Sequence, residues 1–138
     1  MAISRNQEHF IAMTVIYNEL NDFYNGNGQV FRDASSLIAS LCELPYEACP
    51  AYITNVVKAS LDNYGEITKV FIPKLKNWEW KRIPLLTQSI LLMSYAHYYM
   101  IEKVDKRIVI NTAVKLAKTY IDEKQAKFIN ALLDEVLK

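Results

Sequence analysis

The chain has 138 residues, of which 51% are hydrophobic and 22% are charged, with three glycines and four prolines. A chain of this length forms one ordinary domain with a real core, and this composition excludes disordered, collagen-like and low-complexity proteins. The net charge of +1 hides an uneven distribution, because residues 1–66 carry three basic and eight acidic side chains, whereas residues 67–138 carry thirteen and seven. The second half is therefore the expected face for a polyanion, unless its lysines only keep outer helix faces hydrated.

The two cysteines and the N-terminus suggest no special chemistry. Cys42 and Cys49 fit no metal-ligand spacing and have no neighbouring histidine, so we expect reduced thiols and no metal site. The N-terminus lacks a basic segment leading into a long apolar stretch, so neither a secretory signal nor a membrane anchor is expected. The expected location is the cytoplasm.

The first helix is predicted over roughly residues 5 to 24. Ser4 and Gln7 have the spacing of a capping box. The sequence NGNG at residues 25–28 tolerates positive φ angles and predicts that the helix ends and the chain reverses there. The buried stripe of the helix is predicted at steps of three and four residues: Phe10, Met13, Tyr17, Leu20 and Tyr24.

Two more helices are predicted before residue 66. Asp33 can cap a short helix that ends before Pro45. Pro50 opens the next helix, and Gly65 stands at the position favoured just past a helix end. These helices would complete an acidic N-terminal subdomain over residues 1–65.

The second half begins with a helix from Glu66 that Pro73 should kink or split. The run Ile83–Ile101 follows and contains no charged side chain. It is long enough to cross a bilayer, but the five polar residues and three tyrosines within it favour a buried central helix wrapped by others. Two last helices are predicted, one over Ile108–Tyr120 and one capped by Asp122.

No stretch shows the period-two alternation of a strand, and no repeat of 20 to 50 residues is present. The prediction is an all-α fold of about seven helices, with a C-terminal helical subdomain over residues 66–138. No nucleophile elbow, HExxH motif or glycine-rich phosphate loop is present, so we expect no enzyme activity, no catalytic residue and no cofactor.

Three side chains attract attention in the second half. His97 can be a buried base or ligand, but a lone imidazole among apolar residues is more often a hydrogen-bonded core member. Trp78 and Trp80 lie beside a run of lysines, where aromatic rings can stack on bases. Helical spacing places Trp78 on the buried stripe and leaves Trp80 free to face outward.

Two C-terminal segments resemble a known family. The sequences INTAVKLAK at residues 110–118 and KFINALLD at residues 127–134 are similar to the INEAVELAK and KFVNGVLD signature of the NusB transcription antitermination factors. Looser similarity includes Asn77-Trp78 with Arg82, and Ser4-Arg5 near the start. The resemblance spans nearly the whole chain and implies two three-helix bundles plus an extra helix.

The resemblance also implies a function. Family members bind boxA-type RNA together with NusE, a ribosomal protein, and help transcription of ribosomal RNA operons pass terminators. The expectation is therefore a non-enzymatic RNA- and protein-binding factor of the antitermination type, acting with the transcription elongation complex. The expected RNA-binding residues are Arg5, His9, Lys124 and Lys127.

This chain departs from the family pattern at both kinds of contact. The arginine-rich first helix is reduced to one permanent cation, Arg5, and each lost phosphate contact weakens RNA binding. Leu92 and His97 replace two charged family residues in the central run. The expected partner-binding residues are Trp80, Arg82, Leu92 and His97. The alternative is a NusB-fold scaffold that has lost specific RNA recognition and works through protein contacts, as a homodimer.

Overall fold

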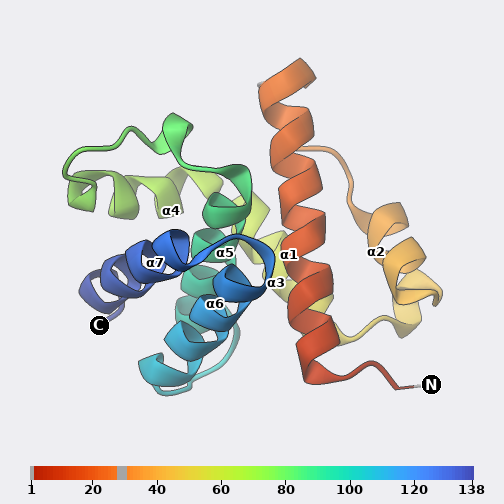
Figure 1. The fold of residues 1–138 in the computed structure, drawn as a ribbon. Coiled ribbons are helices and arrows are strands. Elements are labelled where there is room, and N and C mark those ends of the chain that lie inside the picture. The colour runs from red at the N-terminus through yellow and green to blue at the C-terminus, as the bar shows by residue number, and fades with distance from the viewer. Residues whose placement is uncertain (1, 28–30) are drawn as a thin grey trace.

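A computed structural model describes residues 2–27 and 31–138. These residues form seven α-helices and no strand (Figure 1), as predicted. Short 3₁₀ or π turns extend or connect the helices. The α-helices are α1 (Arg5–Asp22), α2 (Ser35–Cys42), α3 (Ala51–Asp62), α4 (Tyr64–Phe71), α5 (Leu85–Ala96), α6 (Lys106–Tyr120) and α7 (Glu123–Val136).

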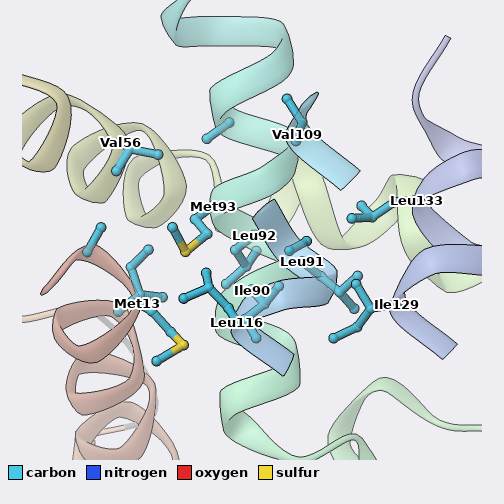
Figure 2. Packing of buried hydrophobic residues seen from close by; sticks show 14 of the residues in the cluster. Met13, Val56, Ile90, Leu91, Leu92, Met93, Val109, Leu116, Ile129 and Leu133 are labelled. Atoms are coloured by element: carbon cyan, nitrogen blue, oxygen red, sulfur yellow. The ribbon is translucent and has the colours of Figure 1, made fainter. Parts of the chain in front are cut away.

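Helix α5 lies at the centre of the molecule and packs on α1, α3, α4, α6 and α7 (Figure 1). Its side chains are buried on all sides, which confirms the prediction of a central helix. Figure 2 shows Leu91 and Leu92 of α5 between Met13 of α1 on one side and Ile129 and Leu133 of α7 on the other. Truncating such a side chain to alanine costs about 2–5 kcal/mol.

Three buried polar side chains of α5, those of Thr87, Gln88 and Ser89, have hydrogen-bond partners. Gln88 Nε2 donates to the carbonyls of Trp80 and Ile83, both at 3.0 Å. Ser89 Oγ donates to the Leu85 carbonyl at 2.7 Å. A buried polar group is tolerated when it is hydrogen-bonded. No helix in residues 2–27 and 31–138 is both long and apolar enough to cross a membrane.

One hydrophobic cluster joins the two halves of the sequence. Met13 and Ile53 from the first half and Leu91, Ile129 and Leu133 from the second half all belong to it. The two halves are therefore connected through α5. The division into subdomains 1–65 and 66–138 stays a prediction.

Several helix ends differ from the predictions. The α-helix α1 ends at Asp22, and a π turn continues it over Phe23–Asn27 into the predicted NGNG stop; Gly28 lies outside the described residues. Gly65 does not end α3, because α4 starts at Tyr64 and runs through it. Helix α4 ends at Phe71, and a 3₁₀ turn holds Pro73, which confirms that this proline breaks the helix.

The buried face of α1 is also wider than the predicted stripe. Phe10 and Tyr24 are 37% exposed, although both were expected inside. The residues that are buried include Ala12, Val15 and Ile16, because α1 is covered by both α3 and α5. A helix that is covered from two directions buries more than one stripe.

Candidate nucleic-acid and partner interfaces

A side-chain cap fixes where Arg5 and His9 lie at the start of α1. The Gln7 N–H donates to Ser4 Oγ at 3.2 Å, and the Ser4 N–H donates to Gln7 Oε1 at 2.8 Å. This capping box was predicted, and it satisfies two backbone donors of the first turn. Arg5 and His9 are one turn apart, so they lie on the same face of α1.

Two carboxylates already engage the Arg5 guanidinium. Nη1 lies 3.2 Å from Glu8 Oε1, and Nη2 pairs with Oε1 of Glu102, which lies between α5 and α6. The guanidinium carbon also lies 4.2 Å from the centre of the Tyr52 ring, which is a cation–π contact. The one permanent cation of the first turn is therefore paired within the protein.

His9 and His97 lie beside this ion pair, around the Tyr52 ring. Each imidazole meets that ring edge-on, with ring centroids 5.2 Å apart, and Tyr52 Oη lies 3.3 Å from His97 Nδ1. His97 Nε2 lies 3.0 Å from Glu102 Oε1. The two atoms are close enough for an ion pair, but their geometry does not meet the angular criteria of a hydrogen bond. Both histidines are buried.

The two histidines are neutral at pH 7. Burial, together with the positive charge of Arg5, lowers the pKa of His9 from 6.5 to about 4. Burial also lowers the pKa of His97, although the Glu102 carboxylate acts against it. His9 therefore adds no positive charge to the RNA-binding face that the sequence predicted.

A groove of about 350 Å³ lies between α1 and α6. Its lining is mostly polar: Asn6, His9, Asn111, Thr112, Lys115, Leu116, Thr119 and Tyr120. The Tyr120 ring also contacts the Phe10 ring, with centroids 5.0 Å apart, and the two rings are 44% and 37% exposed. Amides, hydroxyls, one lysine and exposed aromatic rings are groups that a single-stranded nucleic acid contacts.

The start of α7 carries the other two predicted RNA-binding residues. Asp122 caps this helix as predicted, with Oδ1 accepting from the Gln125 N–H at 2.7 Å. Gln125 Oε1 accepts from the Thr87 hydroxyl of α5 at 2.8 Å. Lys124 and Lys127 are exposed, and no carboxylate of the described residues forms a salt bridge with either.

The four predicted RNA-binding residues lie on two surfaces. Arg5 and His9 lie at the start of α1, where His9 lines the α1–α6 groove. Lys124 lines a different groove, beside Trp78 and Phe128. Their roles stay predictions.

Three of the four predicted partner-binding residues are buried, which corrects their expected exposure. Leu92 has no exposed surface, and His97 is 5% exposed. Trp80 is 7% exposed and donates from Nε1 to the Tyr64 hydroxyl at 3.2 Å. Arg82 is exposed. The two tryptophans have exchanged the predicted places, since Trp78 is 49% exposed.

The break at Pro73 explains this exchange. Helical spacing from α4 no longer applies after Phe71, and a 3₁₀ turn over Trp80–Arg82 places Trp80 against the core. Trp80 stacks on Phe71 there, with centroids 5.9 Å apart. Pro73 lies between α4 and both tryptophans, so helical spacing counted from α4 cannot predict which tryptophan is buried.

Trp78 and Phe128 line two grooves of about 80 and 250 Å³, which we call the Trp78–Phe128 surface. Its walls come from the segment after α4 and from α7. Sequence reasoning missed this surface, because no local pattern shows that Trp78 faces α7. The other lining residues are Lys74, Leu75, Lys76, Asn77, Ile83, Pro84, Lys124, Gln125, Ala131, Leu132 and Glu135.

Among residues 2–27 and 31–138, no three His, Cys, Asp or Glu side chains are placed to hold a metal ion.

Glu102 is a site residue that sequence reasoning missed entirely. It lies 97 positions from Arg5 in the sequence, so only the fold brings the two charges together. No signal short of a tertiary contact could have found it.

Comparison with solved structures shows the same fold. NusB from T. maritima matches with a TM-score of 0.77 and 16% identity, covering 99% of this chain and 92% of that one. A protein chain in a crystal structure of a plectonemic RNA supercoil matches with a TM-score of 0.75 and 22% identity, covering 96% and 92%. At these identities the likeness concerns the fold.

Sequence comparison identifies the family. The transcription antitermination protein NusB of Listeria welshimeri is 32% identical over 85 residues, which are 62% of this chain and 66% of the relative. The protein of the same name from an Exiguobacterium species is 30% identical over 92 residues, which are 67% and 71% of the two chains. The NusB family model matches residues 12–138. The chain therefore belongs to the NusB family.

Proposed function

We propose that this protein is a non-enzymatic factor of the transcription antitermination type, which binds boxA-like RNA through the α1–α6 groove. The observation that carries the proposal is the groove itself, on a chain that belongs to the NusB family. Its relatives are named as transcription antitermination proteins. Such a factor works at the elongation complex, which in bacteria lies in the cytoplasm.

The groove offers two kinds of contact to a single strand. Lys115 supplies a charge for a phosphate, and Asn6 and Asn111 supply donors and acceptors for sugars and base edges. Tyr120 and Phe10 present exposed rings on which a base can stack. Polar and aromatic groups of the groove thus supply part of the RNA contact that the missing arginines would provide.

The test is a titration of labelled boxA-like RNA at several salt concentrations. We expect Tyr120→Ala to weaken binding by about 1–3 kcal/mol, the usual value of one stacked base. Tyr46→Ala is the matched control, since Tyr46 is 40% exposed on a different part of the surface. Absence of saturable binding below about 10 µM, where non-specific contacts begin, would overturn the proposal.

We propose the Trp78–Phe128 surface as the contact for the protein partner, which for this family is expected to be NusE. An exposed tryptophan beside small apolar grooves has the character of an interface hot spot. Trp78→Ala should weaken NusE binding by about 2 kcal/mol or more. Ile108→Ala is the control, because Ile108 is 56% exposed on α6. Equal effects of the two variants would contradict this assignment.

The second candidate is a protein-binding scaffold without RNA recognition, acting as a homodimer. The pairing of Arg5 with Glu8 and Glu102 favours it, because the first turn then offers no unpaired cation. Light scattering separates the two candidates when combined with the RNA titration. A monomer that binds boxA-like RNA rules out the scaffold, whereas a dimer without RNA affinity supports it.

A further inference from the structure

The Arg5–Glu102 ion pair joins the first turn of α1 to the segment between α5 and α6, and both side chains remain accessible. The Arg5 side chain is 48% exposed and the Glu102 side chain is 43% exposed. Ion pairs with this exposure contribute about 0–1 kcal/mol, so they open at little cost. An incoming anion can therefore compete for Arg5.

The pair lies beside the α1–α6 groove. Asn6 and His9 line the groove, and Arg5 precedes Asn6 and lies one turn before His9. A strand in the groove would therefore bring phosphates close to Arg5. A carboxylate and a phosphate offer a guanidinium the same kind of acceptor, namely anionic oxygens that take N–H donors.

The contacts of Arg5 leave room for a better acceptor. Nη1 contacts Glu8 and Nη2 contacts Glu102, so neither carboxylate takes both nitrogens. A phosphate can accept from both nitrogens at once, which is the stronger arrangement. Glu102 would not be left without a partner, because its side chain is 43% exposed and water can hydrogen-bond to it.

We infer that Glu102 holds the place of an RNA phosphate at Arg5, so that RNA binding in the α1–α6 groove requires the Arg5–Glu102 pair to open. Glu102 is then an internal competitor that lowers the affinity for RNA. This inference rests on the proposed function, and it adds a residue that regulates the same site. It also explains how the protein can keep an arginine at this position without presenting a free cation.

The test measures the affinity for a labelled boxA-like RNA across salt concentrations. Glu102→Gln keeps the size of the side chain and removes its charge. We expect this variant to bind about fivefold more tightly, the equivalent of one exposed ion pair. The slope of log K against log salt should stay close to that of the wild type, since Arg5 neutralises the same phosphate in both complexes and only the cost of opening the pair is removed.

Glu47→Gln is the matched control, because Glu47 is exposed on the turn before α3 and changes the net charge equally. A double-mutant cycle isolates the pair. In the Arg5→Gln background, Glu102→Gln should have no effect beyond that of the control, because no guanidinium remains for Glu102 and an RNA phosphate to compete for. Thermal unfolding without RNA verifies that every variant is folded.

The outcomes are distinct. If the wild-type protein binds RNA and Glu102→Gln behaves like Glu47→Gln, or binds more weakly, the inference is wrong and the proposed function stands. If no variant binds RNA, the proposed function is wrong, and the pair is only a structural contact. Tightening by Glu102→Gln that disappears with Arg5→Gln supports the inference.

Discussion

The starts of α1 and α7 look alike in sequence and differ in the structure. Each helix begins with a side-chain cap, Ser4 for α1 and Asp122 for α7, and each carries predicted RNA-binding residues in its first turns. At α1 the cation Arg5 is paired and the neighbouring His9 is buried and neutral. At α7 the lysines are exposed to solvent.

The difference shows that the number of basic residues does not measure what a helix start offers to an anion. The first turns of α1 belong to a polar cluster that joins three segments of the chain, in which His9, Tyr52 and His97 are buried and Arg5 and Glu102 are partly exposed. The first turn of α7 is capped by Asp122 and joined to α5 by the hydrogen bond from Thr87 to Gln125, and neither contact involves Lys124 or Lys127. We therefore expect stability to depend on pH at α1 and binding to depend on salt at α7.

The largest expected effect is at the start of α1, where acid should lower the free energy of unfolding through His9. The pKa of His9 is about 4 in the folded protein and 6.5 when unfolded, so the unfolded state binds more protons between these values. The stabilising effect of neutral His9 is complete above pH 6.5 and is lost as the pH falls to about 4. The loss should reach roughly 3 kcal/mol at most.

Urea unfolding from pH 7.5 to pH 4 measures this loss. His9→Phe keeps a ring in the same place and removes the titrating group, so its stability should fall less steeply over this range. The Glu and Asp residues titrate in both proteins, and the difference between the two curves isolates His9. Parallel curves would contradict the prediction.

The next effect is at the start of α7, where loss of the Thr87–Gln125 hydrogen bond should lower the free energy of unfolding. Gln125→Ala removes the acceptor of the Thr87 hydroxyl, which has no exposed surface. A buried hydroxyl without its partner costs about 1–3 kcal/mol, and urea unfolding at pH 7.5 measures it. Asn130→Ala, at an exposed position of the same helix, should stay within about 0.5 kcal/mol. A similar loss in both variants would show that the hydrogen bond is unimportant.

The smallest effect sharpens the contrast in RNA binding. Replacing both Lys124 and Lys127 by Gln should reduce the salt slope by about 0.7 for each lysine that contacts a phosphate. Arg5→Gln should change the slope by about 0.7 at most, because it removes one cation and the double variant removes two. RNA titrations across salt give both slopes, and a larger change for Arg5→Gln would reverse the comparison.

Much of the fold could be predicted from the sequence, because local signals determine it. The caps at Ser4 and Asp122, the break at Pro73 and the uncharged run of α5 all act within a few residues of themselves. They set helix starts, a helix end and the most buried element. The family motifs near the C-terminus gave the same answer independently.

The candidate site could be predicted only in part, because it depends on tertiary contacts. Whether Arg5 is free depends on Glu102, and whether His9 is charged depends on its burial beside Tyr52. The exposure of Trp78 depends on how the chain turns after α4. Helical periodicity contains none of this information, and it placed Trp78 and Trp80 on the wrong sides.

The central position of α5 has a consequence for how the molecule opens. Because α5 packs on helices from both halves of the chain, neither half can lose its structure while the other keeps an intact core. The amides of α5 should therefore exchange with deuterium only through complete unfolding, at a rate that tracks global stability. The first turn of α1, by contrast, is joined to the rest of the molecule partly by the exposed Arg5–Glu102 pair, so it should open locally at a lower cost than α5.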